Sequence, residues 1–275
     1  MAEPLVLSDD PRPRVRRLTL NQPEKRNALS NELRRQLFDD LRRGDADPDI
    51  SVILIRGAGS CFSAGYDLAQ SPEEPPARHA AAVDGWWSRH VVEGWFEIWD
   101  YATPVVASVH GWCLAGGTEL ATACDLVHVA EDAVIGYPPV RLMSPPDMTW
   151  QPWLLGLRRA MEAVLTGDAM TGAEAVQAGF ANRAHPAAEL DDAVLDVAAR
   201  IALVPLELLA LNKRAVHRAM DAMGIRTGIR AGADIQALGF HQPTSQATFR
   251  RLAEGVTDAL EERDRQFGDY RTRSD

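Results

Sequence analysis

This chain of 275 residues contains little lysine and has no net positive charge. Lysine occurs only at Lys25 and Lys213, and the formal net charge is −10. General binding to nucleic acids or anionic membranes requires a cationic surface that displaces counterions. The charge therefore argues against both kinds of partner, and we expect any anionic ligand to be bound by a few local residues.

Cysteine and long apolar runs are scarce as well. The three cysteines, Cys61, Cys113 and Cys124, are odd in number and lack metal-ligand spacing, which favours buried reduced thiols over disulfides or a metal site. No segment reaches the roughly 20 apolar residues of a membrane span, and the first residues lack the apolar stretch of a secretory signal. We expect a globular protein of the cytoplasm.

What the sequence does contain is an alternation of strand and helix patterns. Short apolar runs predict strands over residues 15–21, 51–57 and 104–111. Helical periodicity follows the first strand, with Ser30 as a candidate cap, and a small-residue helix over residues 119–124 leads into another strand at 125–130. The repeated order of strand, turn and helix predicts an α/β fold with ligand sites at the turns.

The last part of the chain has a different character. From about Ala187 the periodicity is almost wholly helical, and the apolar faces of these helices need partners, which predicts subunit association. We therefore divide the chain into an α/β core over residues 1–195 and a helical region over residues 196–275. Residues 71–95 begin rich in proline and glutamate and predict a loop that leads into a helix.

Two turns carry the candidate chemistry. "CFSAGYDL" (residues 61–68) and "LAGGTEL" (residues 114–120) each follow a predicted strand and place small residues where a helix begins. Main-chain N–H groups at a helix start lack internal acceptors and can stabilise an oxygen that gains negative charge. The alternative is that both segments are tight turns in which glycine serves only packing or a positive φ.

Four motifs in order identify a family. "NQPEKRNAL", "CFSAGYDL", "VHGWCLAGGTELATACDL" and "LTGDAMTGAEAVQAGFANRAHP" resemble the enoyl-CoA hydratase/isomerase (crotonase) superfamily over nearly the whole chain. The resemblance implies a spiral of ββα units, a C-terminal helical region that forms homotrimers or homohexamers, and an acyl-CoA thioester as substrate. It also implies that the N–H groups of Ala64 and Gly116 form an oxyanion hole, and that Lys25, Arg26 and Lys213 contact CoA.

The resemblance also predicts the acid/base groups. Glu119, about one helical turn after Gly116, matches the first of the two glutamates of a family hydratase. Pro139 occupies the place of the second glutamate. Asp147 matches the catalytic aspartate of the dienoyl-CoA isomerase branch, although an aspartate after two prolines is also a good turn or cap residue. We therefore predict catalysis by Glu119 and leave Asp147 open between the two roles.

The expected function is that of an enoyl-CoA hydratase. The alternatives are an enoyl- or dienoyl-CoA isomerase using Glu119 and Asp147, a thioester hydrolase or dehalogenase in which Asp147 attacks with His90 as base, and an inactive CoA-thioester binder. A hydrolase of another fold with Cys113 as nucleophile is also considered. No metal or redox cofactor is expected, since coenzyme A belongs to the substrate. The remaining predicted substrate contacts are Ala28, Ser63, Gly65, Asp67, Leu68, Gly117, Tyr137, Pro139 and Trp150, and the further aromatic candidates for an acyl pocket are Trp86, Trp87 and Trp153.

Overall fold

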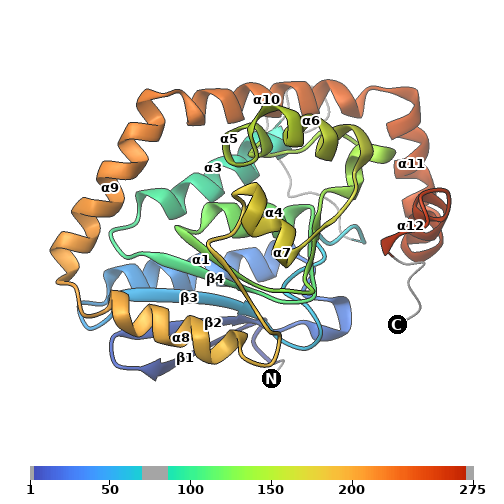
Figure 1. The fold of residues 1–275 in the computed structure, drawn as a ribbon. Helices are drawn as coiled ribbons and strands as arrows, with labels where there is room; N and C mark the ends of the chain where they lie inside the picture. Colours follow the sequence, from blue (N-terminus) through green and yellow to red (C-terminus); the bar gives the residue numbers. More distant parts are fainter. Residues whose placement is uncertain (1–2, 70–85, 271–275) are drawn as a thin grey trace.

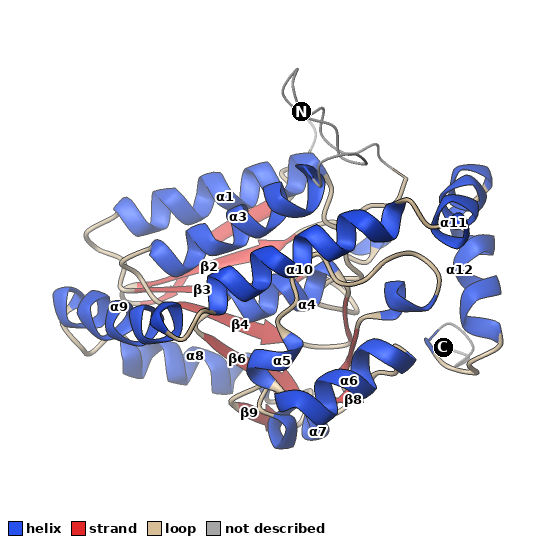
Figure 2. Ribbon diagram, turned by 90° about the horizontal axis from the view of Figure 1, so that it is seen from above, coloured by secondary structure: helices blue, strands red, loops and turns tan. Residues whose placement is uncertain are grey.

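A six-stranded sheet forms the centre of the molecule. The structure, a computed structural model, describes residues 3–69 and 86–270. The strand order is β1-β2-β3-β4-β6-β9, in which only the β1–β2 pair is antiparallel (Figures 1 and 2). The strands are β1 (Val6–Arg12), β2 (Val15–Leu20), β3 (Val52–Gly57), β4 (Val105–Val109), β6 (Leu126–Ala130) and β9 (Arg183–His185).

A second sheet is made of three short strands. β5 (Trp112–Leu114) pairs in parallel with β7 (Val134–Gly136), which pairs antiparallel with β8 (Met170–Thr171). Each large-sheet strand β4 and β6 is followed by a small-sheet strand, β5 and β7 respectively, and then by a helical segment. This repeated passage from large sheet to small sheet to helix builds the spiral of ββα units.

Helices cover the large sheet and extend beyond it. α1 (Asn31–Ala46) packs against β1 and β2, and α8 (Leu190–Ile201) packs against β3, β4 and β6. The central strands are buried on both faces, as their continuous apolar sequences require. The other helical segments of this part are η1 (Pro23–Lys25), α3 (Trp86–Asp100), α4 (Gly116–Ala123), η2 (Pro138–Arg141), α5 (Gln151–Leu154), α6 (Gly156–Thr166) and α7 (Gly172–Ala178).

The C-terminal helices form an arch around the rest of the chain (Figure 1). They are α9 (Leu206–Ala222), α10 (Ile225–Phe240), α11 (Pro243–Glu254) and α12 (Val256–Arg265). The predicted division at residue 195 falls inside α8, and α10 packs on α3 of the core. Across the described ranges, the search for a helix of membrane-spanning length and hydropathy found none.

Most predicted elements are confirmed. β2, β3, β4 and β6 lie where the apolar runs predicted strands, and the Ser30 hydroxyl caps α1 by accepting the Leu33 N–H at 3.1 Å. The helix predicted at the end of residues 71–95 is α3, and the first part of that segment, residues 71–85, lies outside the described residues. The sequence analysis missed β1, whose alternating pattern is broken by Asp9, Asp10 and Pro11, and the short strands of the small sheet.

Candidate active site

The turn after β3 is held by a buried asparagine. The Asn27 side-chain amide donates to the carbonyls of Ala58 and Cys61, both at 2.8 Å, and so ties this turn to the segment before α1. Ser63 is also buried; its hydroxyl donates to the Asn27 carbonyl at 2.8 Å and accepts the Gly65 N–H at 3.2 Å. Gly65 has φ +98°, and a Cβ there would lie 2.9 Å from the Leu114 carbonyl oxygen. Only glycine suits this position.

The start of α4 meets that turn directly. A Cβ on Gly117 would lie 2.7 Å from the Ser63 carbonyl oxygen, and a Cβ on Gly116 would lie 2.8 Å from the Tyr66 ring. The ideal Cβ position of Gly65 is 3.3 Å from the Gly116 nitrogen. The two small-residue turns therefore converge, as the sequence predicted, because neither carries a side chain that would keep them apart.

The main-chain donors at this junction differ from those predicted. The Ala64 N–H donates to the Arg26 carbonyl at 2.9 Å and is thus already engaged, so Ala64 is corrected as an oxyanion donor. Within residues 3–69 and 86–270, no acceptor bonds the N–H of Tyr66 or that of Gly116. The N–H groups of Tyr66, two residues beyond Ala64, and of Gly116 are therefore available as donors.

A buried pair of carboxyl groups lies beside these turns. Glu119 is 0% exposed and Asp147 is 6% exposed. The Tyr137 hydroxyl lies 3.0 Å from Glu119 Oε1 and 3.1 Å from Asp147 Oδ2, and thereby bridges the two. On Oε2, Glu119 accepts hydrogen bonds from the Tyr66 hydroxyl and, at 3.2 Å, from Trp95 Nε1. The pair is thus one hydrogen-bonded unit.

Burial changes the acidity of both carboxyl groups. Burial, and then the charge of Asp147, raises the pKa of Glu119 to about 8. Burial raises the pKa of Asp147 to about 6, against hydrogen bonds from Ser88 and Tyr137 that favour its ionised form. Two coupled carboxyl groups with separated pKa values share one proton at neutral pH. The arrangement therefore places one protonated and one ionised carboxyl group in one site.

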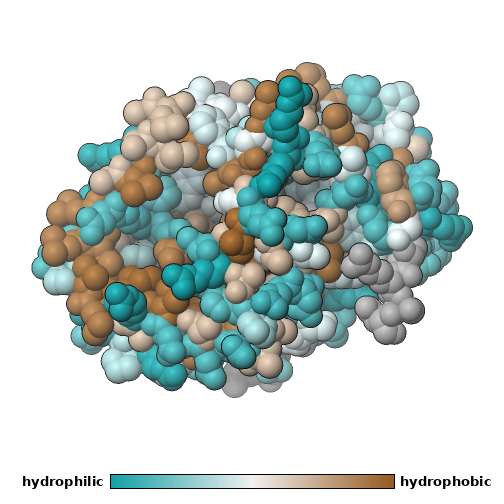
Figure 3. Space-filling view, in the orientation of Figure 1, coloured by the Kyte–Doolittle hydropathy of each residue, from teal (hydrophilic) through white to brown (hydrophobic). Residues whose placement is uncertain are grey.

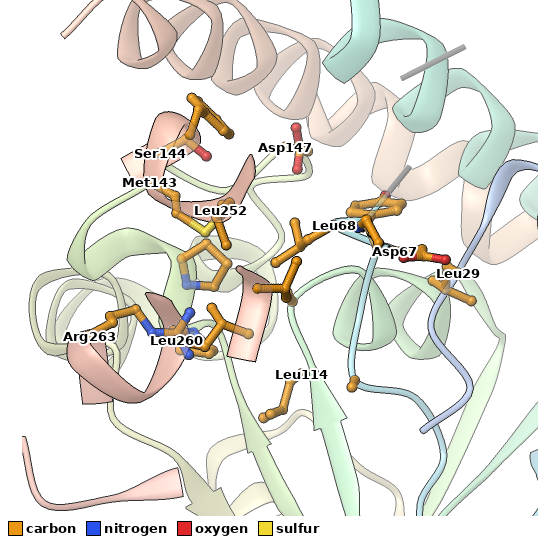
Figure 4. Close-up of a pocket in the computed structure, with 18 of the residues that line it drawn as sticks. Leu29, Asp67, Leu68, Leu114, Met143, Ser144, Asp147, Leu252, Leu260 and Arg263 are labelled. Atoms are coloured by element: carbon orange, nitrogen blue, oxygen red, sulfur yellow. Dashed lines mark hydrogen bonds between the residues drawn. The ribbon is translucent and has the colours of Figure 1, made fainter. Parts of the chain in front are cut away.

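A cavity of about 610 Å³ opens in front of the pair. Asp147, Tyr66 and Tyr137 line it, whereas Glu119 lies behind the two tyrosines. Figure 4 shows Asp147 at one edge, Leu29 and Asp67 on one side, and Leu260 and Arg263 of α12 on the other. The rest of the wall is largely apolar and includes Leu114, Met143, Phe240, Phe249 and Leu252. Both the core and the C-terminal helices therefore enclose the cavity.

Several predicted contact residues lie at this cavity. Ala64, Asp67, Leu68, Tyr137, Pro139 and Trp87 line it. Lys25 is half exposed, with its Nζ 3.5 Å from Oδ2 of Asp67, and Arg26 is exposed, with its guanidinium 4.7 Å from the ring centre of the cavity residue Trp112. Ala28 adjoins Leu29, and Ser63, Gly65 and Gly117 shape the turns without lining the cavity.

Two predicted contacts are corrected by their surroundings. Lys213 is 8% exposed, and its ammonium donates to the carbonyls of Ile98 and Thr103 at 2.8 and 3.1 Å and lies 2.9 Å from Asp125 Oδ2. It joins α9 to the core and is not available to CoA in this chain. Trp150 is buried against Phe180, and its indole N–H donates to Thr118 at 3.3 Å, so it belongs to the core.

The alternative nucleophile schemes lose support. His90 stacks on Trp86, with ring centres 5.1 Å apart, and neither residue lines the cavity. Trp153 is also away from the cavity, against Gly228 of α10. Cys113 is buried in β5, and burial raises the pKa of its thiol well above the ordinary value, which disfavours the reactive thiolate. Cys61 and Cys124 are buried free thiols as well.

The sequence analysis missed the aromatic and polar support of the carboxyl pair. Tyr66, Trp95, Ser88 and Gln236 all belong to it; the Ser88 hydroxyl lies 3.1 Å from Asp147 Oδ1 and also bonds Gln236. A signal existed only for Tyr66, which is the one bulky polar residue among the small residues of the first turn. The others lie 24 to 148 residues from their partners, so no local pattern connects them.

A buried acid/base pair that faces an enclosed, mainly apolar cavity on an α/β spiral is the architecture of an enzyme. The chain belongs to the enoyl-CoA hydratase/isomerase family, whose model matches residues 12–271. It is 31% identical over 264 residues to the putative enoyl-CoA hydratase EchA13 of Mycobacterium tuberculosis, covering 89% of this chain and 83% of that protein.

Solved structures agree with this assignment. A crystal structure of an enoyl-CoA hydratase from Mycobacterium smegmatis superposes with a TM-score of 0.87 at 32% identity, over 97% of this chain and 95% of that one. A crystal structure of an enoyl-CoA hydratase/isomerase from Xanthobacter autotrophicus superposes with a TM-score of 0.86 at 31% identity, over 95% and 98% of the two chains. The fold predicted from the motifs is thereby confirmed.

Proposed function

We propose that this protein is an enoyl-CoA hydratase that adds water to a 2-enoyl-CoA through a thioester enolate. The single observation that carries the proposal is the buried Glu119–Asp147 pair, bridged by Tyr137 and placed against the cavity beside two unengaged main-chain donors. The names of the similar proteins support the same chemistry.

The thioester oxygen would bind to the N–H groups of Tyr66 and Gly116. These donors are arranged before the reaction and strengthen their hydrogen bonds as the oxygen becomes anionic, which stabilises the transition state more than the substrate. Loss of one such donor typically costs about 2.7–4 kcal/mol. Exposed Lys25 and Arg26, beside residues of the cavity, are suited to the anionic groups of CoA.

The proton steps would use the pair in opposite protonation states. Ionised Asp147 takes a proton from water as the water oxygen bonds the β-carbon, and the double-bond electrons move to the thioester oxygen. Protonated Glu119 then supplies a proton to the α-carbon through the hydroxyl of Tyr66 or Tyr137, since Glu119 itself does not line the cavity. Transfer across Tyr137 from Asp147 to Glu119 restores the starting state. No metal or redox cofactor takes part in this scheme.

We also propose that the chain assembles into trimers. A cyclic trimer uses two different, complementary surfaces of each subunit. One exposed apolar surface is the α9 face, Leu203, Leu208, Leu211 and Val216, which lies at the left edge of Figure 3. The other is the α6–α10 face, Leu157, Met161, Leu165, Ile235 and Leu238, which adjoins a second, shallow cavity. Two separate apolar faces on one chain suit head-to-tail closure.

A panel of acyl-CoA thioesters followed by mass spectrometry tests the function. We expect straight-chain or aromatic 2-enoyl-CoAs to gain one water, and Glu119→Gln or Asp147→Asn to lower the rate by about 10²- to 10⁴-fold, since each removes a positioned acid or base. Glu131→Gln, an exposed glutamate outside the site, is the matched control.

Other outcomes identify the alternatives. A product of unchanged mass with a moved double bond would make the protein an isomerase with the same pair. Release of free CoA would make it a hydrolase, and binding of thioesters without turnover would make it a binder. A rate that is the same in Glu119→Gln as in the unaltered protein would contradict the acid/base assignment.

A further inference from the structure

A buried arginine without a carboxylate partner lies behind the active site. Arg34, on α1, is 5% exposed. Its Nε and Nη1 have no hydrogen-bond acceptor, and no ion pair joins Arg34 to another residue of the described part of the chain. An isolated buried charge is strongly destabilising unless its surroundings compensate for the lost water. The position therefore demands a source of negative potential.

Aromatic rings provide the nearest negative potential. The Arg34 guanidinium lies over the rings of Trp87, Tyr66 and Trp95, with its Cζ 5.3, 6.0 and 6.0 Å from their centres. The face of such a ring attracts a cation, while its polar edge remains free to donate a hydrogen bond. A desolvated contact of this kind is stronger than an exposed one, because little water competes for the cation.

Two of those three rings lead directly to the catalytic pair. The hydroxyl of Tyr66 and the indole N–H of Trp95 both donate to the same atom, Glu119 Oε2, and Trp95 Nε1 also lies 3.1 Å from the Tyr66 hydroxyl. The cation thus lies on the faces of two rings whose polar edges carry the carboxylate. A cation over a ring makes its edge a better donor, so the charge of Arg34 acts on the pair through these rings.

The charges in this cluster balance for one protonation state only. With one shared proton the pair carries one negative charge, which neutralises Arg34. The titratable side chains bonded to the pair are Tyr66, from the turn after β3, and Tyr137, from the segment before η2; α3 contributes the uncharged Trp95 and Ser88, and α10 the uncharged Gln236. Arg34 is the cation that this network connects to the pair, through the rings of Tyr66 and Trp95.

We propose that Arg34 is a positioning residue that keeps the Glu119–Asp147 pair singly ionised by acting through the rings of Tyr66 and Trp95. Its charge also lowers the pKa of Asp147 and that of the Tyr66 hydroxyl, in opposition to burial. The catalytic consequence rests on the proposed function, but the protonation state of the pair does not.

Neutral replacements of Arg34 test this inference. We expect Arg34→Met and the more conservative Arg34→Gln to move both limbs of the rate–pH profile upward by one unit or more, because both carboxyl groups lose a favourable cation. The rate at pH 6 should fall about fivefold or more and recover largely at pH 9. Arg35→Met, one residue away but exposed and paired with Glu32 and Asp39, is the matched control and should leave the profile in place.

Arg34→Lys separates charge from packing. It keeps the cation and loses the planar stacking, so its rate can fall while the limbs of its profile stay within a few tenths of a unit of the unaltered protein. Circular dichroism checks each fold. If the neutral variants do not fold, Arg34→Lys decides alone: unmoved limbs support the inference, and moved limbs overturn it. Folded neutral variants with a uniformly lower rate and an unmoved profile would show that Arg34 is merely structural.

A second readout needs no substrate. Infrared titration follows the carbonyl band of the protonated carboxyl groups, identified by its loss in Glu119→Gln and Asp147→Asn. We expect the midpoint for its disappearance to rise in Arg34→Met or Arg34→Gln and to stay in place in Arg34→Lys. A protein that turns over no enoyl-CoA but shows this shift would contradict the proposed function and support the role of Arg34. An unmoved midpoint in a folded neutral variant overturns that role.

Discussion

At the scale of single residues, the site depends on two carboxyl groups in a nearly water-free environment. Glu119 was predictable because it follows the glycines of α4 by about one helical turn. Asp147 was a candidate that the sequence left open between catalysis and a turn, because its position follows a proline-rich stretch where one residue more or less would turn the side chain to solvent. The structure brings both under the Tyr137 hydroxyl.

The stability of the unliganded protein should fall as pH rises. Both pKa values are raised on folding, so their stabilising contribution is complete below the ordinary carboxyl range and is lost as pH rises through about 6 for Asp147 and about 8 for Glu119. We expect the free energy of unfolding of Glu119→Gln to rise relative to that of the unaltered protein by a few kcal/mol between about pH 5 and pH 9. One pKa unit corresponds to about 1.4 kcal/mol.

Urea unfolding at several pH values measures this difference. Asp147→Asn should gain stability relative to the unaltered protein at lower pH than Glu119→Gln does. Glu131→Gln, on the surface, should show no such gain in stability. Parallel stability curves for Glu119→Gln and the unaltered protein across this range would contradict the raised pKa of Glu119.

At the scale of elements, the convergence of the two turns places the main-chain donors. Gly65 combines φ +98° with a crowded environment, whereas Gly224, which precedes α10, has φ +99° with no atom within 4 Å of a Cβ. The two glycines therefore separate backbone strain from steric contact. The comparison provides a test of the junction that leaves the carboxyl pair intact.

Gly65→Ala should therefore impair both stability and turnover. Gly224→Ala should cost only the left-handed strain of about 1–2 kcal/mol and leave the rate unchanged. Gly65→Ala should lose more stability and also lower the rate by about 10²-fold or more, because its Cβ forces the Tyr66 and Gly116 N–H groups apart. Thermal unfolding and steady-state kinetics of the two glycine variants measure these effects. Equal rates in the two variants would show that the junction does not bind the reacting oxygen.

At the scale of the whole molecule, the α9 face and the α6–α10 face should form one repeated head-to-tail contact. Leu211→Asp disrupts the first face and Leu165→Asp the second, since both side chains are more than half exposed on their surfaces. Each variant alone should sediment as a monomer of 30.1 kDa, whereas the unaltered protein sediments at three times that mass.

Mixing the two variants makes the test specific. Each retains the face that the other has lost, so the mixture should form a dimer with one intact contact and no trimer. The exposed double substitution Arg250→Asp with Arg265→Asp, on α11 and α12 and away from both faces, controls for added negative charge. A mixture that stays monomeric, or single variants that still form trimers, would contradict the head-to-tail arrangement.

The sequence by itself determined the main elements and the two turns. Apolar runs, helical periodicity and the Ser30 cap are local features, because strands and helices express their burial within a few residues of chain. Those patterns located β2, β3, β4, β6 and the C-terminal helices. Strands of two or three residues carry too little periodicity to be found in this way, and the small sheet was missed for that reason.

The tertiary structure alone decided which groups meet. It showed that the Ala64 N–H is engaged, that Lys213 of α9 is buried against the core, and that Tyr66 and Trp95 bond Glu119 while Arg34 lies over their rings. These contacts join residues far apart in the chain, and their strength depends on the exclusion of water, which no local pattern records. Sequence proximity thus specified the donors and acids that were possible, and packing selected the ones that act together.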